Sequence, residues 1–241
     1  MRFTSSTISP LLKKGRGKED IFGAPALTYI EEKNIERKLG RNLTSYAYSQ
    51  PMAWGHLMER VVFEMVGLEY DLVSMDSRLH PDDVLGQYWS GTPDLEIKGK
   101  LISEIKCYQL KNFAKYTECL MAEDTELMKK DFPAEYWQIV SNCIINKVPI
   151  GEAISFMPYR SDLERIRHEI EETNFLERHD FEPWQMRFVV ERKFHELPFI
   201  EEGGYFKNLN IFRFVVPLED MELLTSRVQL ASQLLIEIPK K

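Results

Sequence analysis

The sequence has no long hydrophobic run and few cysteines, and both absences narrow the class of protein. No apolar stretch approaches the roughly 20 residues of a membrane-spanning helix. The first residues, Met1–Ser6, lack the apolar core of a signal peptide, so we expect a cytoplasmic protein. Cys107, Cys119 and Cys143 form no CxxC pair and are too few for a four-cysteine iron–sulfur cluster. We therefore expect them to be small core residues.

Positive charge is also in the minority, because the formal net charge is −7 at pH 7. This total does not indicate nucleic-acid binding, although the distribution of charge counts for more than the sum. Basic residues nevertheless precede the first acidic one, Glu19; they are Arg2, Lys13, Lys14, Arg16 and Lys18. This run is either an arm that contacts phosphates or a solvated loop, and the sequence leaves both open.

The 241 residues, 44% of them hydrophobic, suit one large globular domain spanning 1–241. Apolar spacing, caps and glycine breaks predict helices, one short and six longer. Their ranges are 8–12, 24–39, 52–68, 112–130, 134–146, 162–176 and 218–236. Strands are expected within 69–80, at 84–90, on both sides of the turn 98–100, and at 152–158. Two stretches rich in Phe and Val, 185–194 and 209–216, are expected to pair.

The most informative stretch for chemistry is 91–106, which contains an acid, a short hairpin, and then an acid and a lysine one residue apart. Side chains alternate along a strand, so Glu104 and Lys106 share one face, and the turn at 98–100 brings Asp94 back beside them. Two carboxylates suit a hard divalent cation, and a lysine beside them can hold a water and steady a phosphate. The alternative is a surface hairpin with solvated charges.

Two polar residues on otherwise apolar predicted helices are further candidates. Glu59 lies at the edge of the apolar stripe of 52–68, and no basic residue stands three or four positions away. Gln138 lies among buried residue types in 134–146. Each is either a solvated side chain or a polar group that faces the site.

Several separated stretches, in order along residues 4–158, resemble the lambda-type phage exonucleases, also called the YqaJ-like viral recombinases, within the PD-(D/E)XK nuclease superfamily. The matching segments are Thr4-Ser5-Ser6, FGAPALTYI at 22–30, Trp54 to Glu59, Thr92-Pro93-Asp94, Glu104-Ile105-Lys106-Cys107 and Tyr136-Trp137-Gln138. The sequence departs from the family pattern at Val140, where a second glutamine is common. No family motif is recognisable after about residue 160.

The resemblance implies a metal centre. Asp94 and Glu104 would ligate Mg²⁺, with Mn²⁺ as a substitute, and the backbone carbonyl of Ile105 would assist. Glu59 would complete the metal environment through a water or a second ion.

The resemblance also implies roles around the metal. Lys106 would orient and activate the attacking water, and Gln138 would position that lysine or the nucleophile. Ser6 and Thr92 would grip a terminal phosphate. These residues would therefore complete a site for hydrolysis at a DNA end.

The implied fold is α/β, with a restriction-endonuclease-like mixed central sheet flanked by helices. A nuclease core over 1–158 would be followed by an extension over 159–241 with strands and a closing helix. The implied activity is degradation of one strand of linear duplex DNA from the 5′ end, in a bacterial or phage-infected cell. The implied partners are a single-strand annealing protein and copies of the chain in a ring-shaped trimer. Two alternatives remain, an endonuclease and an inactive DNA-binding module.

Overall fold

The computed structural model describes residues 1–241 except 18, 44–48, 68, 73–76, 173–176, 178–186, 188, 190 and 238–241. Its main feature is a sheet of five strands in the order β2-β5-β6-β7-β8. The strands are β2 (Asp71–Leu72), β5 (Leu95–Ile97), β6 (Leu101–Lys106), β7 (Ile150–Phe156) and β8 (Leu209–Val215). The strands β6 and β7 are parallel and the other neighbours are antiparallel. The sheet is therefore mixed, which confirms the predicted fold class.

A second sheet of three short strands ties the N-terminus to the segment that leads into the hairpin. It consists of β1 (Phe3–Thr4), β4 (Trp89–Gly91) and β3 (Arg78–Leu79). Strand β4 lies in the middle, parallel to β1 and antiparallel to β3. This pairing brings the first residues of the chain beside the segment just before Asp94.

Seven α-helices and four short 3₁₀-helices are assigned in the described residues. The α-helices are α1 (Ala24–Leu39), α2 (Gln50–Val66), α3 (Leu110–Met121), α4 (Thr125–Asp131), α5 (Pro133–Asn146), α6 (Arg160–Glu172) and α9 (Leu218–Ser232). The 3₁₀-helices are η1 (Ser5–Thr7), η2 (Ser9–Leu12), η3 (Leu85–Gln87) and η4 (Phe194–Glu196). Most of the predicted helices are confirmed, and α1 has the predicted bounds. Residues 173–176 of the predicted helix 162–176 lie outside the described residues.

The structure corrects three predictions about secondary structure. The predicted helix 112–130 is two helices, because Glu123 has a positive φ of 51° and the Asp124 side chain caps α4. The predicted strand 84–90 is η3 followed by β4. The third concerns 209–216, where β8 pairs with β7 instead of with 185–194. Much of 185–194 lies outside the described residues, and its described part forms no strand.

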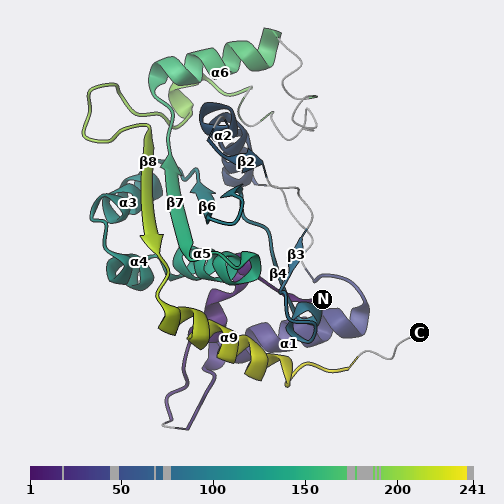
Figure 1. The fold of residues 1–241 in the computed structure, drawn as a ribbon. Helices are drawn as coiled ribbons and strands as arrows, with labels where there is room; N and C mark the ends of the chain where they lie inside the picture. Colours follow the sequence, from purple (N-terminus) through teal and green to yellow (C-terminus); the bar gives the residue numbers. More distant parts are fainter. Residues whose placement is uncertain are drawn as a thin grey trace.

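The two faces of the main sheet carry separate hydrophobic clusters, as the alternation of side chains requires. Ile102 and Phe212 pack on the cluster that contains buried residues of α5 and α9. Leu101 and Ile105 pack on the cluster that contains the apolar stripe of α2. Figure 1 shows α2 on one side of the strands and α5 with α9 below them.

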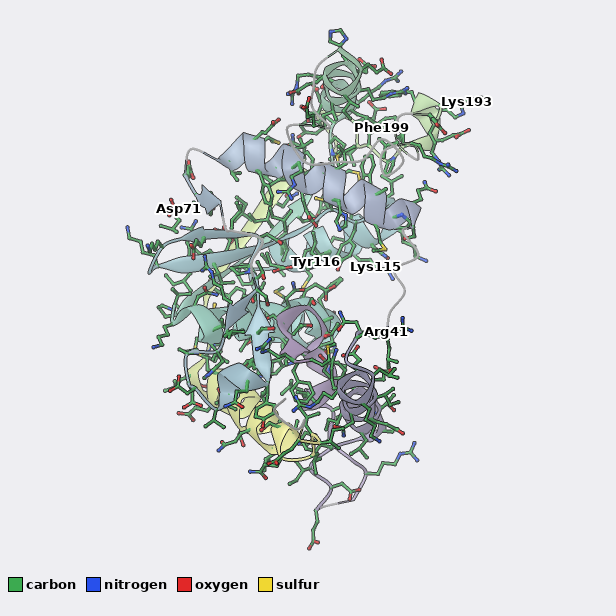
Figure 2. All side chains as sticks on the ribbon, turned by 90° about the vertical axis from the view of Figure 1, so that its right-hand side faces the viewer. Arg41, Asp71, Lys115, Tyr116, Lys193 and Phe199 are labelled. Carbon is green, nitrogen blue, oxygen red and sulfur yellow. The ribbon has the colours of Figure 1, made fainter. Side chains whose placement is uncertain are left out.

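Side chains fill the interior of the molecule. Tyr116 is fully buried and lies near the middle of the side view, whereas Arg41, Asp71 and Lys193 lie at its edges (Figure 2). The cysteines Cys107, Cys119 and Cys143 are free and buried, which confirms that they are core residues. No helix of the described residues is long and apolar enough to cross a membrane.

Candidate active site

The hairpin of β5 and β6 places Asp94 beside Glu104. The Asp94 amide donates to the Ser103 carbonyl at 3.1 Å. The Ile105 amide donates to Asp94 Oδ2 at 2.7 Å. These two bonds fix the carboxylate of Asp94 against the end of β6, where the sequence predicts that it returns.

Two side chains, Lys106 from β6 and Gln138 from α5, converge on the Glu104 carboxylate. Lys106 Nζ lies 2.7 Å from Glu104 Oε1 and 3.2 Å from Gln138 Oε1. The Gln138 amide nitrogen also donates to Glu104 Oε1. Glu104 is only 2% exposed, although its own strand ends at Lys106. The structure therefore brings Gln138 into the site, and it is not a solvated helix residue.

The close carboxyl groups have perturbed acidities. Burial, and then the charge of Asp94, raise the pKa of both Glu59 and Glu104 to about 8. Burial also raises the pKa of Asp94, against the opposing charge of Lys106. Burial lowers the pKa of Lys106, but the charges of Glu104 and Asp94 outweigh it and raise this pKa overall. Glu59, on α2, therefore interacts electrostatically with the groups on β6 across the sheet.

The donor set fits magnesium better than an ion that needs a cage of protein ligands. In the part of the chain that the structure describes, no three His, Cys, Asp or Glu side chains are grouped to hold a metal. Magnesium is usually bound by one or two carboxylates, while water and substrate phosphates supply its other ligands. Asp94 and Glu104 supply such a pair, and burial raises the pKa of both carboxyl groups.

The N-terminal residues line a cavity of about 1140 Å³ that is rich in hydroxyl groups. Its lining includes Arg2, Thr4, Ser6, Lys33 and Ser90. Thus Arg2 and Ser6, both exposed, face one space. The two residues predicted to bind the terminal phosphate, Ser6 and Thr92, do not share this cavity, because only Ser6 lines it.

The remaining basic residues of the predicted arm lie on the loop between η2 and α1. Lys13, Lys14 and Arg16 are exposed, and Lys18 lies outside the described residues. This loop projects beyond α9, away from β6 (Figure 1). The structure does not bring these residues to Glu104, and a contact with DNA stays a prediction.

Sequence reasoning missed a buried polar group behind the site. Ser141 accepts a hydrogen bond from Trp89 Nε1 at 2.9 Å and lies 2.7 Å from the Ser5 hydroxyl. Its neighbour Asn142 is fully buried and reaches Glu104. The signal was present in the sequence, because Asn142 lies one helical turn after Gln138 and therefore on the same face.

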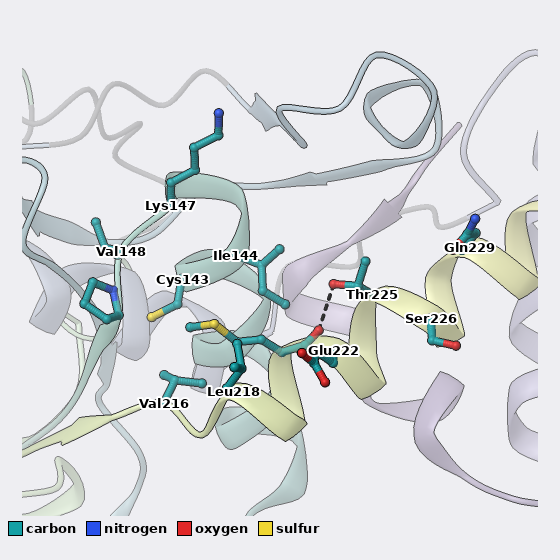
Figure 3. Close-up of a pocket in the computed structure, with 12 residues that line it drawn as sticks. Cys143, Ile144, Lys147, Val148, Val216, Leu218, Glu222, Thr225, Ser226 and Gln229 are labelled. Carbon is teal, nitrogen blue, oxygen red and sulfur yellow. Dashed lines mark hydrogen bonds between the residues drawn. The ribbon is translucent and has the colours of Figure 1, made fainter.

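The structure also contains an apolar cavity that is separate from these groups. It has a volume of about 700 Å³ and lies between the end of α5, the end of β8 and α9 (Figure 3). Cys143, Val216, Leu218 and Met221 contribute to its lining. None of the predicted site residues lines it.

The fold defines the class of architecture, which is that of solved alkaline and phage-related exonucleases. One is the alkaline exonuclease LHK-Exo from Laribacter hongkongensis, also solved with dAMP, with a TM-score of 0.58 and 13% identity over 97% of this chain and 87% of that one. Another is a phage-related exonuclease from Haemophilus somnus 129PT, with a TM-score of 0.59 and 13% identity over 97% and 93%. No protein-family model and no curated protein matches the sequence.

Proposed function

We propose that the protein is a magnesium-dependent exonuclease that hydrolyses one strand of linear duplex DNA. The observation that carries the proposal is the convergence of Asp94, Glu104, Lys106 and Gln138 at the end of β6. The likeness of the fold to exonucleases supports the same class of reaction. Removal of nucleotides from the 5′ end rests on the family resemblance of the motifs.

Asp94 and Glu104 would hold the cation, with the Ile105 carbonyl beside them. When bound, magnesium supplies Lewis-acid stabilisation of the charge that develops on the scissile phosphate. The chain contributes a buried, oriented carboxylate pair. The Ile105 amide restrains Asp94, while Lys106 and Gln138 restrain Glu104.

Lys106 acts as a charged hydrogen-bond donor. Its raised pKa keeps it an ammonium at neutral pH, so it orients the attacking water or a phosphate oxygen and does not take up a proton. Gln138 accepts from the ammonium and holds it toward the reacting atoms. Glu59, with a pKa raised to about 8, is the nearby acid that exchanges protons close to neutral pH.

The substrate side of the proposal concerns the DNA end. Ser6 and Arg2 would contact the terminal phosphate, since they share the hydroxyl-rich cavity. A contact of Thr92 with the same phosphate rests on the family resemblance alone. The ring-shaped trimer, the annealing partner and a role in phage-type recombination are further parts of the same proposal. They rest on the resemblance of the sequence motifs.

The test uses purified protein with magnesium and two substrates. One is a linear duplex labelled at one end of one strand, and the other is a covalently closed circle. Loss of one strand from the linear DNA, with the circle intact, supports the exonuclease and gives its direction. Cutting of the circle would show that the protein is an endonuclease and would refute the exonuclease proposal. Binding without cleavage of either DNA would indicate an inactive DNA-binding module.

A further inference from the structure

The helix α5 offers a second amide to the Glu104 carboxylate. Asn142 Nδ2 lies 3.5 Å from Glu104 Oε2 and 3.5 Å from the Thr92 carbonyl oxygen. Both neighbours are acceptors, so only the NH₂ group of the amide can face them. Asn142 thus contacts two segments of the site. One is strand β6, and the other is the segment between β4 and Asp94.

The two oxygens of Glu104 have different surroundings. Lys106 and Gln138 both donate to Oε1, which fills the two acceptor positions of that oxygen. Oε2 lies 3.5 Å from Asn142 Nδ2, and the side chain of Asp94 also interacts with the Glu104 carboxyl group. Oε2 is therefore the oxygen with room to bind a cation, and Asn142 sets the direction in which it points.

Asn142 destabilises the folded state if its role is purely structural. The side chain is fully buried, and its Oδ1 has no hydrogen-bond partner within the described part of the chain. An orphaned buried acceptor destabilises the folded state, whereas an apolar side chain of the same shape does not carry that cost. Stability alone therefore does not explain an asparagine at this position.

The chain also makes space for this amide with a glycine. A Cβ at Gly91 would lie 2.4 Å from Asn142 Oδ1 and 2.0 Å from the Ser5 hydroxyl oxygen. Both distances are far below a van der Waals contact, so neither group could keep its place beside a larger residue. The close approach of Asn142 to the site depends on the missing side chain.

We infer that Asn142 is a positioning residue that orients the Glu104 carboxylate and the turn before Asp94 for the divalent cation. The inference rests on the proposed function, because it assigns the amide to the same metal site. Residues that hold a metal ligand in place typically change metal affinity or activity by about 10–100-fold when they are replaced. That range sets the expected effect.

The experiment compares Asn142→Leu and Asn142→Ala with a matched control on the same helix, Asn146→Ala. Asn146 donates to the Asn142 carbonyl at 2.7 Å and contacts Arg78. Within the described residues, no hydrogen bond joins Asn146 to Glu104. Magnesium binding is titrated by calorimetry without DNA, and the melting temperature is measured without metal. The cleavage rate is then recorded as magnesium is raised.

We expect both Asn142 variants to bind magnesium about 10–100-fold more weakly and to recover cleavage at high magnesium. Asn142→Leu should melt at or above the wild-type temperature, while Asn146→Ala should keep wild-type affinity for magnesium. If Asn142→Leu does not fold, the magnesium affinity of Asn142→Ala tests the inference.

Three results would overturn the inference. Wild-type affinity in the Asn142 variants, with the wild-type protein binding magnesium and cutting DNA, would refute this role alone. Equal weakening by Asn146→Ala would show that α5 acts through its overall geometry and not through the amide. A wild-type protein that neither binds magnesium nor cuts DNA would refute the proposed function and this inference with it.

Discussion

Replacing Lys106 by methionine tests the proposed chemistry and the protonation of its neighbour in one variant. The substitution keeps the length of the side chain but removes the ammonium that lies 2.7 Å from Glu104 Oε1. Loss of one donor to a developing negative charge costs about 10²–10³ in rate in other hydrolases. We therefore expect cleavage of end-labelled linear DNA to fall by at least that factor.

The effect of Lys106→Met on stability depends on whether Glu104 is charged. Removing one partner of a buried ion pair costs about 3–5 kcal/mol. At about 2–4 °C per kcal/mol for a chain of this size, that is roughly 6–20 °C in melting temperature. However, burial raises the pKa of Glu104 to about 8, which is above neutral pH and favours the protonated form at pH 7 without metal. We therefore expect the melting temperature of the metal-free variant to fall by much less than 6 °C at pH 7.

The assays are thermal melting without metal at pH 7 and cleavage with magnesium. Lys100→Met is the matched control, because Lys100 is an exposed lysine in the turn of the same hairpin. It should change neither result. Full activity of Lys106→Met would refute the role of the ammonium, and a fall of 6–20 °C would show that Glu104 is ionised in the folded protein.

Three further predictions concern stability. Because the pKa of Glu104 is raised from 4.5 to about 8, the folded state holds a proton that the unfolded chain loses. The metal-free protein should therefore melt at lower temperature as pH rises from about 5 to about 8, and Glu104→Gln should flatten this dependence. Tyr136→Phe removes the hydroxyl that lies 2.6 Å from the buried Asp220 carboxylate. It should cost about 1.5–3 kcal/mol in urea unfolding, and an unchanged midpoint would contradict the bond. Gly91→Ala, whose Cβ would lie 2.0 Å from the Ser5 hydroxyl oxygen, should cost about 1–3 kcal/mol in the same assay. An unfolding midpoint equal to that of the wild type would show that Ser5 and its segment move aside without loss of stability.

Local patterns in the sequence predicted the elements that depend on local interactions. Helix α1 is bounded by Gly23 and by Gly40, whose φ is +67°, and these signals are visible in the sequence. The placement of Asp94 beside Glu104 followed from the turn and from the alternation of side chains along β6. The approach of Gln138 came from the family resemblance, since composition alone left it on either face of α5.

Pairings between distant segments were not predictable in the same way. Strand β8 pairs with β7, more than fifty residues earlier, through contacts such as Phe212 opposite Ala153. The alternating apolar residues of β8 predict a strand at the edge of a sheet, but they do not predict which strand it pairs with. The contacts of Asn142 were not predictable either, although its spacing from Gln138 places both amides on one face of α5. A single amide on an apolar helix matches no motif until the opposing acceptors are placed in space.

The C-terminal elements support the candidate site from behind. Phe214 of β8 stacks on Tyr136 with ring centroids 5.8 Å apart, and Asp220 of α9 binds the hydroxyl of the same tyrosine. Tyr136 lies two residues before Gln138 on α5, so it faces the side of that helix opposite to Gln138 and Glu104. Genetic changes in β8 or α9 would therefore be expected to give temperature-sensitive proteins that work normally at low temperature, whereas changes at the end of β6 would give inactive proteins at every temperature.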